Sequence, residues 1–296
     1  MGFFGRKRAP SVPHPRKEPR FDGPLTLKRL EQIFQDCVDF TKRPVSLGEG
    51  GACTLTLCYL SGMVKMERVS DYVLRPLAQD EALARCGTPR QAMEEMMGGA
   101  LYNLSAAERT TLDEAAFDLV AGWCLLFFPG ESAVLSLFVG TEEKRSISSP
   151  SNETVLKGSR DAFVESLRTN TSIVRRHLKT PELRIREQVV GRQSVTSVDI
   201  LYIEGLTNPH LVEQVAAQLA DIDIDAVLAT GNIEEYIVPA ARTAFPLVQY
   251  TERSDRFCAG LAEGRVGILI DGLPLGYLAP GVLGGYKCFP RLSGFL

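Results

Sequence analysis

Apolar residues recur along the chain either at helical spacing or in short runs that end at turn residues. The first helix is expected after Thr26, which is a good N-cap residue. Leu27, Leu30, Phe34 and Val38 follow at spacings that place them on one helical face. The chain is therefore expected to begin its folded part with an amphipathic helix.

The same signals predict further elements as far as residue 278. The expected helices cover about 67–77, 88–97, 112–120, 208–220, 233–238 and 255–262. The expected strands cover 54–60, 123–128, 133–140, 183–190, 195–203, 247–250, 266–270 and 275–278. Helices that alternate with pairs of strands are typical of an α/β protein.

The two halves of the chain repeat one pattern. Ile200–Leu206 aligns with Leu57–Met63 at an offset of 143, and matching apolar positions in the next helix follow at 142. A later block of helix, glycine, strand, tight turn and strand recurs around Gly122 and Gly264, again at 142. Because three separate blocks recur at an offset of 142 or 143, we infer an internal duplication. The fold class is predicted to be α/β, with two similar α/β subdomains joined by a linker and a ligand cleft expected between the lobes.

Polar and charged stretches set the predicted domain boundaries. Residues 1–24 carry six Lys/Arg and five prolines, so a disordered basic tail is expected. The polar segment 144–152 is the predicted linker between subdomains at 25–143 and 153–283. Residues 284–296 are expected to form an irregular C-terminal tail.

Composition is that of a soluble globular protein. The 296 residues are 45% hydrophobic and 23% charged with a net charge of −3, which argues against a general nucleic-acid binder. Seven scattered cysteines indicate reduced thiols in a cytosol-like compartment. The longest apolar run, 121–128, is far shorter than the roughly 20 residues that span a bilayer. The basic tail is a candidate contact for an anionic membrane surface, although a solvated tail is the simpler interpretation.

The segment Glu153–Leu183 is the most basic part of the chain. From Lys157 to Arg192 nine Lys/Arg stand against four Asp/Glu. Two helices are predicted in this segment. The first has Asp161 in its first turn and an apolar face of Phe163, Val164 and Leu167.

The second helix of this segment is expected to be capped by Asn170. Arg175, Arg176 and Lys179 are then predicted to point outward. These cations suit an anionic partner such as a lipid headgroup, a phosphate or an acidic face of another subunit. On spacing alone, a solvated helix face with local ion pairs is the simpler explanation.

Patterns for common catalytic and metal sites fail in this sequence. Thr251–Asp255 is explained as the cap of the following helix, where Thr251 or Ser254 can cap and two acids complement the dipole. Asp221–Asp225 imitates an EF-hand start, but Ala226 and Asn232 stand where glycine and glutamate are needed. The three histidines are scattered and no CxxC is present, so no catalytic residue, cofactor or metal site is predicted.

The second half contains a series of short motifs in a fixed order. They are Ser148-Ser-Pro150-x-x-Glu153, Val155-Leu-Lys-Gly158-x-Arg160-x-x-Phe163-Val-Glu165, Asn170, Arg175-Arg176, Pro181-Glu-Leu183, Thr251-Glu-Arg253-x-Asp255, Glu263-Gly264-Arg265 and Asp271-Gly272-x-Pro274. These motifs resemble the N-terminal soluble region of the A subunit of GerA-type spore germinant receptors, and the first half resembles that family more loosely. The chain departs from the family pattern at Ser159 and Ser254, where proline is usual, and in its C-terminal residues, where the family continues into membrane helices.

This resemblance implies a non-enzymatic role in spore germination. Members of the family work with B and C subunits in the inner spore membrane and respond to small nutrients such as amino acids, sugars or nucleosides. The soluble region of the family is implied to lie on the cytoplasmic (core) side and to consist of two α/β subdomains. The alternative is a two-lobed small-molecule sensor or an uncharacterised enzyme that shares only the fold. The predicted partner or ligand contacts are Arg160, Arg175, Arg176, Lys179, Glu252 and Arg253.

Overall fold

A computed structural model describes residues 20–47, 53–100, 105–140, 161–226, 248–283 and 286–287. The predicted linker at 144–152, the predicted helix at 233–238 and Arg160 lie outside the described residues. The chain divides into two compact units. The first comprises residues 1–35, 39–143 and 179–181, and the second comprises 36–38, 144–178 and 182–296.

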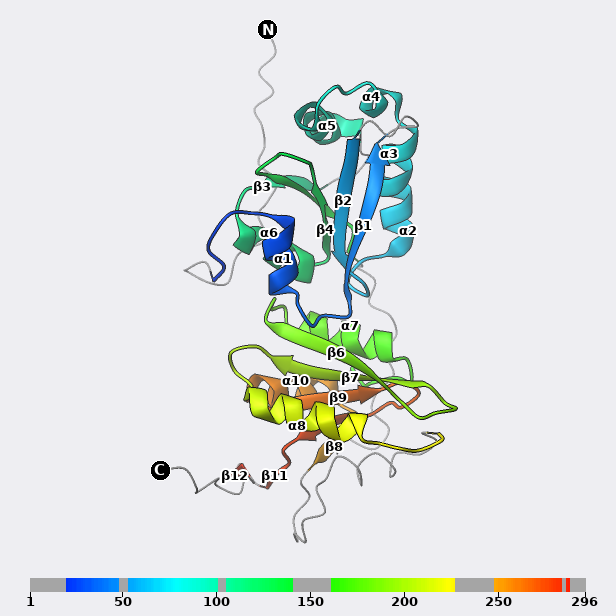
Figure 1. Ribbon diagram of the computed structural model, residues 1–296, viewed down its shortest axis with the longest axis vertical. Coiled ribbons are helices and arrows are strands. Elements are labelled where there is room, and N and C mark those ends of the chain that lie inside the picture. The colour runs from blue at the N-terminus through cyan, green and yellow to red at the C-terminus, as the bar shows by residue number, and fades with distance from the viewer. Residues whose placement is uncertain are drawn as a thin grey trace. The chain divides into compact units, whose positions relative to one another are not determined.

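The first unit is built on a five-stranded antiparallel sheet in the order β1-β2-β4-β5-β3 (Figure 1). Its strands are β1 Phe40–Leu47, β2 Cys53–Leu60, β3 Ala106–Arg109, β4 Trp123–Phe127 and β5 Val134–Phe138. Its helices are α1 Leu27–Ile33, α2 Met66–Val69, the π-helical turn η1 Ser70–Leu74, α3 Arg75–Gln79, α4 Glu81–Ala84, α5 Pro89–Glu95, the π-helical turn η2 Met96–Ala100, and α6 Leu112–Val120.

Helices cover both faces of this sheet, because strand residues alternate between two apolar layers. Leu55 and Leu57 of β2 pack with Val73 of η1 and Leu77 of α3. The opposite face is in contact with α6, which also touches α1. The first unit is therefore a three-layer arrangement of helices, sheet and helices.

The second unit repeats this plan with the strand order β6-β7-β9-β10-β8 (Figure 1). Its strands are β6 Leu183–Val190, β7 Thr196–Ile203, β8 Gln249–Thr251, β9 Val266–Ile270 and β10 Gly276–Ala279, followed by the short hairpin β11 Val282–Leu283 and β12 Tyr286–Lys287. Its helices are α7 Leu167–His177, α8 Pro209–Ala220 and α10 Ser254–Ala262.

Two apolar layers again sandwich the sheet. One layer joins α8 to the sheet through residues such as Val215 and Ile200. The other joins α7 and α10 to it through Val174, Phe257 and Leu269. In Figure 1, α8 runs along the sheet in front of β9, and α7 and α10 lie behind the strands.

The internal duplication and the α/β fold class are confirmed by the shared strand order of the two sheets. The repeat begins earlier than the sequence blocks indicated, because a helix and an edge strand, α1-β1 and α7-β6, open each unit. In each unit a short strand, β3 or β8, forms one edge of the sheet. This strand comes earlier in the sequence than its neighbour in the sheet, β5 or β10. The duplication thus extends over the whole of each sheet.

Most predicted elements are observed within one to three residues of their expected ends. The helix at 112–120 and the strands at 183–190 and 266–270 have the expected bounds. Strands β1 and β3 and helix α4 were not predicted. Val38 does not lie on the first helix, which ends at Ile33, and its side chain is exposed. Residues 286–287 of the predicted irregular tail form β12.

The prediction of two helices in Glu153–Leu183 is wrong for the described residues. Residues 161–166 are irregular, and one helix, α7, begins at Leu167. Asn170 lies inside α7 rather than at its N-cap, which is Ser166. The apolar spacing of Phe163, Val164 and Leu167 suggested a helix, but contacts with distant parts of the chain fix this segment in an irregular path instead.

Candidate functional site

Residues 161–166, called the strap, are the first described residues after the segment 141–160. The strap lies beside the loop between β8 and α10. The Phe163 amide donates to the carbonyl oxygen of Glu252 at 2.9 Å, and Ala162 forms an antiparallel bridge with Arg253. The Phe163 ring is buried edge-on against Phe257 at 5.2 Å. The strap is thus held by hydrogen bonds at its backbone and by a core contact at its aromatic ring.

Two side chains fix the end of the strap at α7. Asn170 accepts the Val164 amide at 2.8 Å and donates to the Val164 carbonyl at 2.6 Å. Asp271 accepts the first amide of α7, that of Leu167, at 3.1 Å. The adjacent Gly272 amide donates to the carbonyl oxygen of Glu165 at 2.8 Å. Asn170 and Asp271 therefore have structural roles that require these residue types.

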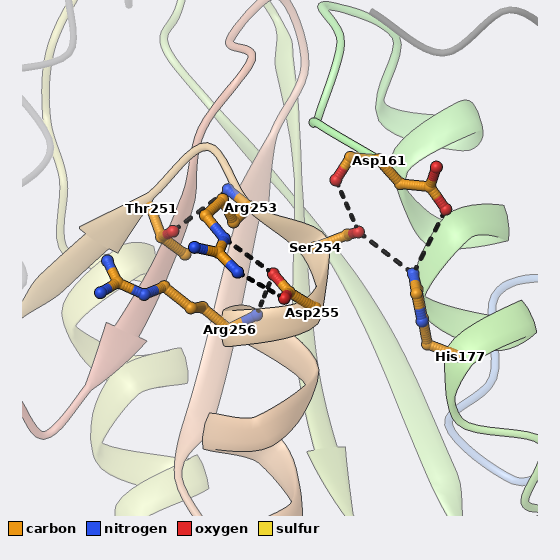
Figure 2. Close-up of polar contacts among 7 residues, drawn as sticks. All are labelled: Asp161, His177, Thr251, Arg253, Ser254, Asp255 and Arg256. Carbon is orange, nitrogen blue, oxygen red and sulfur yellow. Dashed lines mark hydrogen bonds and ion pairs between the residues drawn. The ribbon is translucent and has the colours of Figure 1, made fainter. Parts of the chain in front are cut away.

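Arg253 and Asp255 form a paired contact at the start of α10 (Figure 2). The guanidinium donates to both carboxylate oxygens, at 3.0 and 2.6 Å. This hydrogen bonding by Arg253, helped by the amide of Arg256, lowers the pKa of Asp255 below its ordinary value. The expected cap at Thr251 or Ser254 is not observed, since the N-cap is Arg253 without a side-chain cap and Thr251 instead accepts the Arg253 amide.

Ser254, His177 and Asp161 come together beside this pair (Figure 2). The Ser254 hydroxyl donates to the Asp161 carbonyl oxygen at 2.8 Å and lies 3.1 Å from His177 Nε2. The same ring nitrogen lies 3.7 Å from the Asp161 carboxylate. The hydroxyl hydrogen is used by the carbonyl, so His177 Nε2 carries the hydrogen of the Ser254–His177 contact.

This cluster does not have the geometry of a serine-hydrolase triad. In such a triad the serine and the acid bind opposite nitrogens of the histidine. Here both contact Nε2, and Ser254 is completely buried. The Ser254 hydroxyl therefore has neither a general base nor access to a substrate.

Arg175 was predicted to point outward, and that prediction is wrong. Its side chain is 1% exposed and donates to the carbonyl oxygen of Leu183 at 3.0 Å. Arg175 follows the buried Thr171 by four residues and the buried Leu167 by eight, so it shares their inward face of α7. The Cys37 thiol donates to the same carbonyl at 3.5 Å.

The other predicted contacts that lie within the described residues have different surroundings. Arg176 is half-buried and Lys179 is exposed. Glu252 uses its carbonyl oxygen to hold the strap, and Arg253 is paired with Asp255. Their roles as partner or ligand contacts remain predictions.

Ser254 and His177 form a contact that sequence reasoning did not predict. They lie 77 positions apart in the chain, so no local pattern connects them. The irregular start of the second unit carried no signal either, because its partners at 252–254 and 271–272 come about 90 to 110 residues later. Only the capping pattern of Thr251–Asp255 indicated that this region is structurally constrained.

Three buried thiols in the described residues are poor nucleophiles. Burial raises the pKa of Cys58, Cys124 and Cys258 to about 12. These thiols are therefore protonated at neutral pH. Within the described ranges, no group of three or more His, Cys, Asp or Glu side chains is arranged to hold a metal ion.

Among the residues that the structure describes, no helix is both long and apolar enough to cross a membrane.

Comparison with known proteins gives a consistent family assignment. A family model described as Bacillus/Clostridium GerA spore germination protein matches residues 28–285. Uncharacterized membrane protein YfkQ of Bacillus subtilis (strain 168) is 35% identical over 86% of this chain and 48% of its own length. Spore germination protein KA of the same strain is 33% identical over 82% of this chain and 44% of its own length. Spore germination protein GerLA of Bacillus cereus is 30% identical over 86% of this chain and 51% of its own length.

A solved structure matches the fold as well. It is the N-terminal domain of the A subunit of the Bacillus megaterium spore germinant receptor GerK3, with a TM-score of 0.70 and 26% identity. The match covers 90% of this chain and all of that one. The chain spans about half the length of the curated relatives it matches. These matches show that the chain belongs to the GerA family of spore germination proteins.

Proposed function

We propose that this chain serves nutrient-triggered germination as the soluble region of a receptor A subunit, by binding a ligand or another subunit without catalysis. The observation that carries this proposal is that residues of the family motifs make structural contacts within the second unit. Asn170, Arg253, Asp255 and Asp271 make contacts within the second unit that position backbone and helix ends. None of these contacts supplies the nucleophile and base that hydrolytic chemistry requires.

The partners proposed on the strength of the family are the B and C subunits of a germinant receptor complex. The proposed ligand is a small nutrient such as an amino acid, a sugar or a nucleoside. The proposed location is the inner spore membrane, with this region on the cytoplasmic (core) side. No nucleic-acid partner is proposed, because the net charge of the chain is −3.

Direct ligand binding is tested by thermal unfolding of the purified chain in the presence of amino acids, sugars and nucleosides. A ligand at a hundred times its Kd stabilises the folded state by about 2.7 kcal/mol. We expect the melting temperature to rise by several degrees and to keep rising with ligand concentration. For each ligand that raises the melting temperature, its enantiomer serves as the control for a general solute effect.

If millimolar ligand does not shift the melting temperature, direct ligand binding is removed from the proposal. Assembly with other subunits is then the remaining role. Assembly is then tested by co-purification of the chain with the B and C subunits. Charge reversal at Arg176 and Lys179 is expected to weaken capture if these cations contact an acidic surface. Lys28→Glu, which changes an exposed lysine of α1, is the matched control. Unchanged capture by the reversed variant would exclude this contact.

A further inference from the structure

The cluster of Asp161, Ser254 and His177 joins the beginning of the strap to the end of α7. Asp161 is the first residue of the strap. His177 is the last residue of α7, and the chain returns to the first unit between Leu178 and Lys179. The cluster therefore includes the end of the helix that directly precedes this return.

Ser254 connects the strap and the end of α7 through a buried hydroxyl. Its Oγ donates to the Asp161 carbonyl oxygen at 2.8 Å, and its amide donates to the same oxygen at 3.3 Å. On its other side, Oγ lies 3.1 Å from His177 Nε2. Figure 2 shows Ser254 between the other two residues. Because Ser254 is fully buried at the first position of α10, it has little freedom to follow one neighbour without the other.

We propose that this cluster is a clamp that couples the strap to the C-terminal end of α7, so that loosening of either segment loosens the other. The three residues come from three separate segments, the strap, α7 and α10, and share polar contacts at a single hydroxyl. The strap has no secondary structure of its own, so its order depends on such contacts with its neighbours. The clamp is a conformational device for transmitting a change from the strap to the end of α7, after which the chain returns to the first unit.

Native-state hydrogen exchange of the whole chain tests the clamp. Ser254→Ala removes the hydroxyl and keeps the α10 amide. We expect exchange about three- to tenfold faster in both peptides 161–166 and 174–182, as loss of one or two hydrogen bonds predicts. The peptide over β9, residues 266–270, is expected to stay unchanged. Ser172→Ala is the matched control, because it removes a buried hydroxyl of α7 that bonds only to the Arg168 carbonyl within the helix.

A second variant removes the clamp while keeping the helix start. Ser254→Pro deletes the hydroxyl and the amide donor together. Proline suits this first helical position, and Arg253 already has the extended backbone that proline requires before it (φ −90°, ψ 119°). We expect Ser254→Pro to fold and to accelerate exchange of both peptides at least as much as Ser254→Ala.

The histidine provides a conservative rescue. His177→Gln keeps an N–H donor near the position of Nε2, whereas His177→Leu removes it. We expect the leucine variant alone to accelerate exchange in the strap, which lies outside α7. The proposal is overturned if Ser254→Ala changes only peptide 161–166, if it changes neither peptide, or if every peptide including 266–270 accelerates equally.

Discussion

At the scale of single residues, the second unit contains a charged side chain where an apolar one would be expected. Arg175 lies on the inward face of α7 next to Val174, and its guanidinium donates to the Leu183 carbonyl. A buried cation is stable only when its hydrogen bonds replace those of water. The spacing of apolar residues could not reveal this, because it treats every arginine as a surface residue.

Replacing Arg175 by methionine is expected to destabilise the second unit. Methionine fills a similar volume but cannot donate to the Leu183 carbonyl, so the expected loss is about 2–4 kcal/mol. Urea denaturation followed by circular dichroism measures it. Arg176→Met, next to it on the half-buried side of the helix, should change stability by less than about 0.5 kcal/mol. Equal effects of the two substitutions would contradict the burial argument.

Asp255 gives a prediction about pH. Arg253 lowers the pKa of this carboxyl group in the folded protein, so folding favours the charged form. The resulting stability is present above the unfolded pKa of about 4 and is lost as the pH falls through the lowered folded value. We expect Asp255→Asn to lower the melting temperature at pH 7, and we expect this difference from the wild type to shrink as the pH falls below 4.

The control for this prediction is Asp223→Asn. Asp223 pairs with Arg192, but both side chains are about 70% exposed, so solvent screens the pair. The change should leave the melting temperature almost unaltered at every pH. A difference for Asp255→Asn that stays constant from pH 7 to pH 3 would show that its effect is not electrostatic.

At the scale of elements, the two units use glycine at equivalent turns for the same steric reason. Gly122 precedes β4 with φ +88°, and Gly264 precedes Arg265 and β9 with φ +84°. A Cβ atom at Gly122 would lie 3.0 Å from the Met63 carbonyl oxygen. At Gly264 it would lie 3.0 Å from the Leu206 carbonyl oxygen. In each unit the loop after the second strand therefore approaches this turn too closely for a side chain.

Alanine substitutions separate the cost of the positive φ from the cost of the steric clash at these glycines. Gly122→Ala and Gly264→Ala combine an unfavourable positive φ with a steric clash, and we expect each to lose about 2–4 kcal/mol. Gly130 and Gly272 also have positive φ, but an added Cβ would meet nothing within 4 Å. Their alanine variants should lose only about 1–2 kcal/mol, the backbone cost alone. Chemical denaturation of the four variants would contradict this account if all four losses were equal.

The elements that sequence could predict are those whose own residues determine them. The strand β9, Val266–Ile270, is a continuous buried run, and α6 has an N-cap, acids in its first turn and an apolar face. Strand β1 contains Lys42, Arg43 and Pro44 and lies at the edge of its sheet, so it lacks the apolar pattern. The strap was mistaken for a helix because its partners lie far away in the sequence.

At the scale of the whole molecule, the two repeats share their sheet topology but carry a buried arginine at different positions. In the first unit Arg109 of β3 forms a buried ion pair with Asp118 and lies 5.8 Å from the centre of the Trp123 ring. The position of Trp123 corresponds to Arg265 in the second unit, at the offset of 142. Arg265 donates to Gln249 of β8 and to Glu263. Each unit thus places a buried guanidinium at its short edge strand, from β3 itself in the first unit and from the residue before β9 in the second.

The second unit also depends on residues from far earlier in the chain. Asp36–Val38 belong to this unit, where they pair with the otherwise open edge of β6. The Val38 amide donates to the Ile185 carbonyl at 2.9 Å, and the Ile185 amide donates to the Asp36 carbonyl at 3.1 Å. The assignment is reciprocal, since residues 179–181, which follow α7 as 36–38 follow α1, belong to the first unit. Residues far from the second unit in the sequence thus pair with the edge of its sheet.

A fragment of residues 144–296 tests this dependence. Without residues 36–38 the edge of β6 has no partner, and an open edge favours pairing with other chains. We expect the Ile185 amide to exchange faster in the fragment than in the whole chain, and we expect the fragment to associate with itself on size-exclusion chromatography. A peptide of residues 33–41 added in trans should restore protection at Ile185, whereas the same peptide with Val38→Pro should not, because proline has no amide hydrogen to donate. If the fragment stays monomeric and the Ile185 amide stays fully protected, residues 36–38 are dispensable. The second unit then folds from residues 144–296 alone.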